Sequence, residues 1–250
     1  MTNDVQILNN GYPMPAVGLG VYKIADEQME EVVRTALDAG YRAFDTAYFY
    51  GNEKALGSAL KHSNVERDEL FITSKLWNDY QGYDQTIEYF NKSLDNLGLD
   101  YLDLFLIHWP CENDQLYIES YKALEHLYEE GKIKAIGVCN FKIHHLEKLM
   151  KETKITPQVN QIELHPYFNQ QDVQDFCDEH DIKVTAWMPL MRNKGLLDDP
   201  VITDIAHRYD KTPAQIVLLG ILHIIVLSFL NHKHLNVLKK ILIFLILILS

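Results

Sequence analysis

Three ionisable side chains each stand at the end of a short apolar stretch of this sequence. Asp45 follows the apolar residues of YRAFD, Lys75 ends LFITSK, and His108 follows LDLFLI. Burying one such group alone is costly, whereas a shared site lets them pair and keep their charges. Tyr50 lies five residues after Asp45, within FDTAYFYGNE. The spacing therefore predicts one site that holds a carboxylate, an amine, an imidazole and a phenol.

These four groups together could deliver a proton to a carbonyl oxygen while a hydride attacks the carbon. A phenol gives up its proton near neutral pH only if its pKa, ordinarily about 10, is lowered. We expect Lys75 to lower the pKa of Tyr50, Asp45 to keep Lys75 charged, and His108 to orient the carbonyl oxygen.

Each of the four residues also has an ordinary structural interpretation. Asp45 could cap a helix, and Tyr50 could be a loop or interface tyrosine. Lys75 could be a solvated lysine whose stem packs on its neighbours, and His108 a hydrogen-bonded histidine of the interior. Their joint occurrence at three consecutive strand ends favours the site.

Strand-like and helical patterns alternate along the chain. The predicted strands are 15–20, 42–45, 70–75, 102–107, 133–138, 158–163 and 182–187, and the predicted helices are 27–39, 52–62, 83–97, 115–130 and 170–179. Such alternation predicts a parallel sheet built from βαβ units. Active sites of closed barrels lie at the carboxyl ends of the strands, where the ionisable groups fall here.

A closed barrel is favoured over an open sheet. An open dinucleotide-binding sheet usually carries GxGxxG after its first strand, but the GLG at 18–20 is followed by Val-Tyr and no helix. The preceding VQILNNGYPM predicts a hairpin that turns at 9–11 and caps the bottom of the barrel. A length of 250 residues with no linker fits one barrel domain.

The composition excludes several classes of partner. The formal net charge is −12, and no basic stripe reverses it locally, so we expect no nucleic-acid partner. Three cysteines without CxxC spacing argue against a disulfide framework and fit a reducing cytoplasm. The first ten residues lack the pattern of a secretory signal. His144 and His145 are adjacent and lack the i, i+4 spacing of a shared ligand face, so no metal site is expected.

Seven motifs resemble, in order, those of the aldo-keto reductases. They are GLGVYK, FDTAYFYGNE, FITSKLW, LFLIHWP, GVCNF, NQIELHP and AWMPL, and the resemblance covers residues 5 to about 217. It is closest to bacterial enzymes of the diketogluconate reductase type. The resemblance implies a (β/α)8 TIM barrel fold. It also implies an enzyme that uses NADPH to reduce a small-molecule aldehyde or ketone to an alcohol, and we expect a monomer.

The resemblance also implies roles for individual residues. It gives Asp45, Tyr50, Lys75 and His108 the catalytic roles argued above. At the cofactor it places Cys139, Asn140, Gln161, Trp187, Met188 and Leu190. It places Tyr22, Trp77 and Trp109 in the substrate pocket, although ordinary packing explains these three equally well. Cys139 and Met188 stand where serine is common in relatives, so two hydroxyl groups are missing.

Two other functions stay open. A Schiff-base aldolase would use a neutral lysine at a strand end, which accounts for Lys75 but not for Tyr50, Asn140 and Gln161. A barrel that binds its cofactor poorly or not at all, an inactive product, is the second alternative.

The end of the chain departs from the family. After 212–218 the family continues with an Arg-Trp pair, an eighth strand, and a Lys-Ser motif followed by an arginine that holds the 2′-phosphate of NADP. Here no acidic residue follows Asp210, and Ile, Leu, Phe, Asn and Lys dominate. These residues have A/T-rich codons, so we hypothesise out-of-frame read-through. We therefore divide the chain into a barrel at 1–218 and an aberrant tail at 219–250.

The tail is not expected to span a membrane. Its apolar runs at 218–230 and 241–249 fall short of the ~20 residues that a spanning helix needs. The HIIVL segment at 223–227 is a candidate for a poor eighth strand, so the eighth βα unit is expected to be atypical or incomplete.

Overall fold

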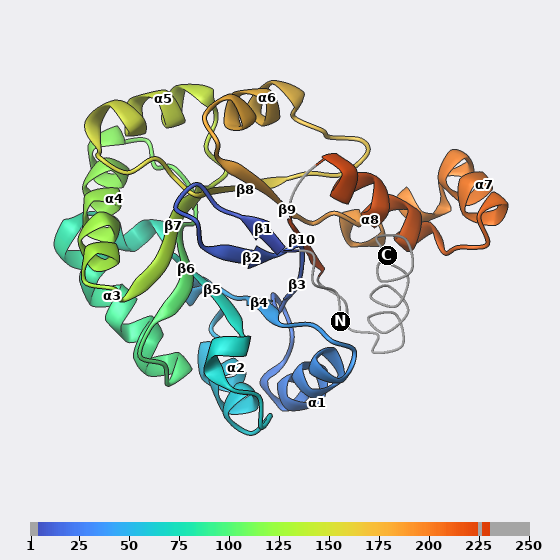
Figure 1. The fold of residues 1–250 in the computed structure, drawn as a ribbon, viewed down its shortest axis with the longest axis horizontal. Coiled ribbons are helices and arrows are strands. Elements are labelled where there is room, and N and C mark those ends of the chain that lie inside the picture. The colour runs from blue at the N-terminus through green and yellow to red at the C-terminus, as the bar shows by residue number, and fades with distance from the viewer. Residues whose placement is uncertain (1–4, 225–226, 231–250) are drawn as a thin grey trace.

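Eight parallel strands form a closed barrel in the computed structural model, which describes residues 5–224 and 227–230. Around the barrel the order is β10-β3-β4-β5-β6-β7-β8-β9, and every neighbouring pair is parallel. The strands are β3 (Val17–Gly20), β4 (Ala43–Asp45), β5 (Phe71–Leu76), β6 (Leu102–Ile107), β7 (Ile133–Cys139), β8 (Val159–Glu163), β9 (Lys183–Trp187) and β10 (Leu227–Leu230). The predicted (β/α)8 barrel is confirmed (Figure 1).

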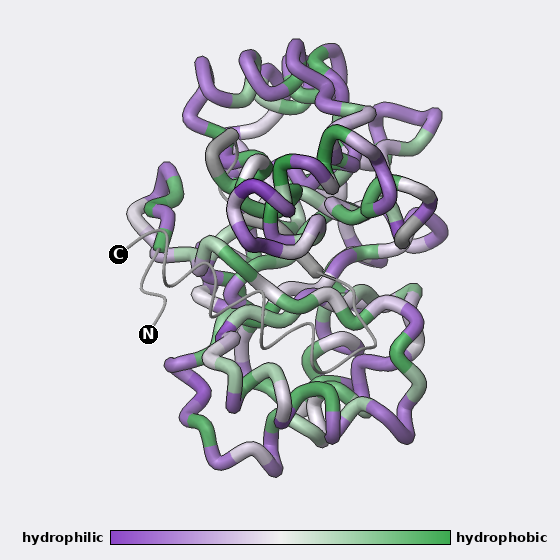
Figure 2. Tube along the Cα trace, turned by 90° about the vertical axis from the view of Figure 1, so that its right-hand side faces the viewer, coloured by the Kyte–Doolittle hydropathy of each residue, from purple (hydrophilic) through white to green (hydrophobic). Residues whose placement is uncertain are grey.

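Helices surround the barrel and cover its outer face (Figure 1). They are α1 (Asp26–Asp38), α2 (Glu53–Lys61), α3 (Tyr83–Leu97), α4 (Asp114–Glu129), α5 (Ile143–Glu152), α6 (Gln171–Glu179), α7 (Pro200–Arg208) and α8 (Pro213–Ile224). Helix α1 shows why they form: its buried residues Met29, Val32, Val33 and Ala36 recur every three or four positions and make one apolar face. Figure 2 shows hydrophobic residues along the central strands and hydrophilic residues on the outer helices and loops.

The strands are buried on both faces, as parallel sheets require. All six residues of β5 and all six of β6 are buried. Gly137 allows β7 and β8 to lie close together, because a Cβ there would stand 2.3 Å from the carbonyl oxygen of Val159. The predicted strands and helices agree with these bounds to within two residues.

The predicted hairpin is present and covers the amino-terminal end of the barrel (Figure 1). It pairs β1 (Val5–Ile7) with β2 (Pro13–Pro15). From its turn, the Asn9 side chain donates hydrogen bonds to the carbonyls of Pro157 and Asp181, each 3.1 Å long, just before β8 and β9. The chemistry therefore lies at the opposite end, where the strands finish.

The eighth strand lies later in the chain than the sequence indicated. Helix α8 continues to Ile224 and β10 begins at Leu227, so His223 and Ile224 of the HIIVL segment belong to the helix and Leu227 begins the strand. An apolar run by itself does not distinguish a buried helix from a buried strand. Residues 231–250, which include most of the predicted tail, lie outside the described residues. Within the described part, no helix is long and apolar enough to cross a membrane.

Candidate active site

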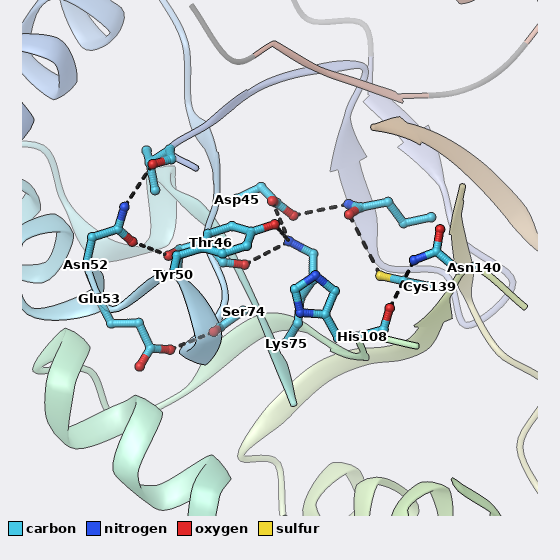
Figure 3. Close-up of polar contacts among 12 residues, drawn as sticks. Asp45, Thr46, Tyr50, Asn52, Glu53, Ser74, Lys75, His108, Cys139 and Asn140 are labelled. Atoms are coloured by element: carbon cyan, nitrogen blue, oxygen red, sulfur yellow. Dashed lines mark hydrogen bonds and ion pairs between the residues drawn. The ribbon is translucent and has the colours of Figure 1, made fainter. Parts of the chain in front are cut away.

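A buried ion pair between Lys75 and Asp45 forms the centre of the site (Figure 3). Lys75 comes from β5 and Asp45 ends the neighbouring β4. The Lys75 Nζ donates to Asp45 Oδ1 at 2.5 Å and to the carbonyl oxygen of Thr46 at 2.8 Å. Lys75 is fully buried and Asp45 is 5% exposed. Such a pair is satisfied only because both charges meet partners inside the barrel.

Tyr50 reaches this pair from the loop that follows β4. It lies in the 3-10 turn η1 (Tyr48–Tyr50), and its hydroxyl is 3.5 Å from Lys75 Nζ. Asn52 holds the loop by donating to the carbonyl of Val21 at 2.8 Å and accepting from the Thr46 hydroxyl at 2.9 Å. The sequence prediction that phenol, amine and carboxylate meet is therefore matched by the geometry.

The pKa of Tyr50 departs from the sequence expectation. Burial raises the pKa of Tyr50 to about 12, and the positive charge of Lys75 opposes that rise without overcoming it. Burial also disfavours the charged form of Lys75, but the Asp45 carboxylate raises the pKa of Lys75 above its usual value. Lys75 is thus charged and Tyr50 carries its proton at neutral pH. The expected net lowering was wrong because the sequence does not reveal how deeply the hydroxyl is buried.

His108 faces the same site from the end of β6. Its ring lies edge-on to Tyr50, with centroids 5.7 Å apart. Burial, and to a lesser extent the charge of Lys75, lowers the pKa of His108 to about 3. Its Nδ1 is buried and has no hydrogen-bond partner among the described residues. His108 is therefore a neutral imidazole with unused hydrogen-bonding capacity.

Asn140 and Trp187 form a hydrogen-bonded pair beside His108. Asn140 follows β7 with a left-handed φ of 62°, a conformation that asparagine tolerates better than most residues. Its side-chain nitrogen donates to the carbonyl of His108 at 3.0 Å (Figure 3). The Trp187 indole N–H donates to Asn140 Oδ1 at 2.8 Å. An amide and a flat ring thus lie together, on two residues that the resemblance implied at the cofactor.

Gln161 has a second connection that the sequence did not indicate. Its side-chain nitrogen donates to Asp45 Oδ2 at 3.1 Å, and its oxygen accepts a weak bond from the Cys139 thiol at 3.8 Å. Both residues are buried. Gln161 therefore joins the proposed cofactor residues to the ion pair. A glutamine in a buried strand was the only signal available, and it does not specify a partner.

Met188 and Leu190 contribute no hydrogen-bonding side chain. Met188 is half-buried with a left-handed φ of 58° directly after β9. Leu190 is 8% exposed and packs into the hydrophobic core.

Among the described residues there is no group of three or more His, Cys, Asp or Glu side chains that could hold a metal ion.

Two of the three predicted substrate-pocket aromatics contact the proton donor or the imidazole, and the third, Trp109, lies 6.4 Å from the ring of Trp187. Tyr22 packs on Tyr50 with ring centroids 4.7 Å apart. Trp77 lies edge-on to His108 at 5.3 Å. Trp109, the residue after His108, is 41% exposed.

Phe49 is an aromatic residue of this site that sequence reasoning missed. It stacks on Trp77 with centroids 3.8 Å apart and an interplanar angle of 17°, and it is 51% exposed. Its place beside Tyr50 in FDTAYFYGNE was a usable signal. The 3-10 turn, which turns Phe49 towards Trp77, was not predicted.

Comparison with known proteins shows which family and which relatives this chain is similar to. The family model described as "Aldo/keto reductase family" matches residues 16–241. A glyoxal reductase of Bacillus subtilis is 49% identical over 216 residues, which make up 86% of this chain and 77% of that protein. A methylglyoxal reductase, DkgA, of Escherichia coli O157:H7 is 48% identical over 212 residues, or 84% of this chain and 76% of that protein.

Solved structures share the whole barrel. An aldo/keto reductase from Brucella melitensis superposes with a TM-score of 0.91 at 42% identity, covering 95% of this chain and 91% of the other. A mutant of Gox0644 in complex with NADPH superposes with a TM-score of 0.90 at 38% identity, covering 96% of this chain and 87% of the other.

Proposed function

The chain belongs to the aldo/keto reductase family, and we propose that it reduces an aldehyde or ketone to an alcohol with Tyr50 as proton donor and NADPH as reductant. One observation carries the proposal: the Tyr50 hydroxyl lies 3.5 Å from a buried, paired lysine. A helix-capping role for Asp45 and a solvated position for Lys75 do not account for that geometry.

Tyr50 donates its proton to the carbonyl oxygen as negative charge develops there. A pKa of about 12 keeps the phenol protonated at neutral pH, and the alkoxide that forms is more basic than the phenolate. Lys75 stabilises the phenolate that remains, because its ammonium stays charged beside Asp45. His108, as a neutral imidazole, donates one N–H to the carbonyl oxygen and orients it.

The nicotinamide end of NADPH, which supplies the hydride when bound, fits the residues present. Asn140 offers both an acceptor and a donor, which suits a carboxamide. The Trp187 indole offers a flat apolar face for one side of a ring. Gln161, with one N–H on Asp45, keeps its second N–H for the same group. Cys139, Met188 and Leu190 supply the adjacent apolar wall.

We propose small aldehydes with an adjacent carbonyl as the first substrates to test, since relatives at 49% and 48% identity are named glyoxal and methylglyoxal reductases. Tyr22, Trp77 and Trp109 would form the pocket walls. We further propose that the protein is a monomer and that it is located in the cytoplasm. The cytoplasmic location is supported by three free cysteines.

The test combines NADPH binding, followed by fluorescence, with turnover of glyoxal and methylglyoxal. Tyr50→Phe should abolish turnover and leave the NADPH dissociation constant nearly unchanged, because only the transition-state proton donor is lost. Retained turnover in this variant would remove Tyr50 from the role of acid. Trapping of a substrate on Lys75 by borohydride would instead favour the aldolase.

A specific observation favours the second candidate, a barrel impaired in cofactor binding. We propose that residues 219–250 are read one nucleotide out of frame. One set of codons illustrates this: if the Arg-Trp pair were encoded by CGT-TGG and followed by CAT, loss of the first G would leave CTT-GGC-AT, which encodes Leu219 and Gly220 and begins Ile221. With these codons the missing Arg-Trp pair is one nucleotide away, directly after Leu218, where the motif resemblance ends.

The later family residues are recoverable in the same shifted frame. Each shifted codon combines the last nucleotide of one codon with the first two of the next. The shifted codon that ends within Asn231 permits Lys, and the next one, which ends within His232, permits Ser, as in the Lys-Ser motif of the family. The shifted codon that ends within Val237 permits only Arg or Cys. The one that ends within Ile241 permits only Asn or Asp, so a polar side chain also returns to the apolar run at 241–249.

The consequence for function is weaker binding of NADPH. Charge-assisted contacts to a phosphate are each worth about 1.5 to 3 kcal/mol, so loss of two moves a micromolar dissociation constant into the millimolar range. The preference for NADPH over NADH should nearly vanish. Sequencing of the locus and of the transcript tests the frame. An intact, in-frame coding sequence for 219–250, or micromolar NADPH binding by the chain as written, would contradict the proposal.

A further inference from the structure

A group of hydrogen bonds links the ends of four strands, β6, β7, β8 and β9, beside the proton donor. The Trp187 indole N–H, at the end of β9, donates to Asn140 Oδ1 at 2.8 Å. The Asn140 nitrogen donates to the His108 carbonyl at 3.0 Å, next to β6. The Asn140 backbone N–H donates to the carbonyl of Gln161 at 2.9 Å. The backbone and both ends of the Asn140 amide are therefore held.

The partners of the Asn140 amide allow only one of its two orientations. An indole nitrogen only donates and a carbonyl oxygen only accepts. If the amide flipped, its NH2 group would face the Trp187 N–H, and its oxygen would face the oxygen of His108. Both contacts would be repulsive. Trp187 thus determines that the oxygen of Asn140 lies on the side of the indole ring.

This arrangement leaves one fixed acceptor position and one fixed donor position on Asn140. The Asn140 oxygen has two lone pairs, one of which accepts from the Trp187 indole N–H. The Asn140 nitrogen has two hydrogens, one of which is donated to the His108 carbonyl. A primary carboxamide presents the complementary NH2 donor and carbonyl acceptor.

We propose that Trp187 is a positioning residue, whose indole N–H aims the Asn140 oxygen at the NH2 group of the nicotinamide carboxamide. The inference rests on the proposed function, since it assumes that the nicotinamide lies against Trp187. It adds that the indole nitrogen, and not only the ring face, contributes to cofactor recognition.

The binding test compares Trp187→Phe with the unchanged protein, using two cofactors. Phenylalanine keeps an aromatic face and lacks the N–H. The cofactors are NADPH and its 3-acetylpyridine analogue, in which a methyl group replaces the NH2 donor. We expect the unchanged protein to bind NADPH roughly threefold to tenfold more tightly than the analogue. The ratio should fall to about one in Trp187→Phe. Trp77→Phe, a matched loss of another indole, should keep the ratio of the unchanged protein.

A second measurement follows the hydrogen bond without any cofactor. The chain has three tryptophans, so an amide correlation spectrum contains three indole N–H resonances. The one assigned to Trp187 should exchange slowly with solvent. It should exchange fast in Asn140→Gly, which removes the amide and tolerates the left-handed backbone of this position.

The outcomes separate the inference from the proposed function. An equal loss of affinity for both cofactors in Trp187→Phe would show that only the ring face matters and would overturn the inference. So would an indole N–H of Trp187 whose exchange is unaffected by Asn140→Gly. Absence of binding of either cofactor to the unchanged protein, even at millimolar cofactor concentration, would refute the proposed function itself, and the role of Trp187 with it.

Discussion

Replacing Lys75 by methionine should destabilise the barrel as well as stop the reaction. Lys75 is fully buried and its ammonium lies 2.5 Å from an Asp45 carboxylate that is 5% exposed. Methionine fills similar volume but leaves that carboxylate buried without its cation. Breaking a buried pair in this way costs about 3–5 kcal/mol. A folded domain has only ~5–15 kcal/mol of stability, so the effect should be large.

The assay is equilibrium unfolding by urea at pH 7, followed by tryptophan fluorescence, on a set of variants. Lys75→Met and Asp45→Asn each leave one buried charge alone, so each should lose several kcal/mol. The double variant leaves neither charge and should regain most of that loss. Lys92→Met is the matched control, because the Lys92–Glu88 pair lies at the surface and such pairs contribute about 0–1 kcal/mol.

The pH dependence gives the same reasoning a second check. Burial raises the pKa of Asp45, and Lys75 opposes that rise. Without Lys75 the folded-state pKa of Asp45 should stand above the unfolded value of about 3.9. An acid whose pKa is raised by folding is destabilising above its folded pKa and ceases to be so as pH falls. The deficit of Lys75→Met should therefore shrink between pH 7 and pH 5. A loss below about 1 kcal/mol, or a double variant no better than the single ones, would refute the argument.

Two further predictions concern single side chains of the site. Cys139→Ser should tighten cofactor binding by about 0.5–1.5 kcal/mol, because a hydroxyl forms a stronger hydrogen bond than the thiol, which now lies 3.8 Å from Gln161. An unchanged dissociation constant would show that this side chain does not face the cofactor. Burial lowers the pKa of His108 to about 3, so its proton resonances should not titrate between pH 5 and 8; because the unfolded imidazole binds a proton below about 6.5, this group should destabilise the fold as pH falls from there towards 3.

The elements were predictable because their patterns have simple physical causes. Parallel strands covered on both faces appear as continuous apolar runs, and β6 at Leu102–Ile107 matches its predicted range in full. Ionisable residues at the ends of such runs must share the open end of the barrel. That argument was enough to bring Asp45, Lys75 and His108 together before any distance was known.

The features that the sequence analysis predicted wrongly or missed depend on the three-dimensional arrangement of the strands and loops. The pKa of Tyr50 depends on how far its hydroxyl is buried, and spacing along the chain does not encode that. The contact between Gln161 and Asp45 spans 116 positions. Phe49 required a 3-10 turn to stack on Trp77. The start of β10 was missed because one apolar run continues through helix α8 into the strand.

The position of the departure from the family pattern separates chemistry from binding. Asp45, Tyr50, Lys75 and His108 all come from β4, β5, β6 and the loops after them. Within the part of the chain that the structure describes, their hydrogen bonds involve no residue beyond Gln161. By the resemblance, the residues that hold the 2′-phosphate would fall after 218, in the segment that we propose is read out of frame. A chain read out of frame there keeps its proton donor and loses affinity for its cofactor. Restoring the frame should therefore lower the dissociation constant of NADPH far more than that of NADH, which lacks this phosphate.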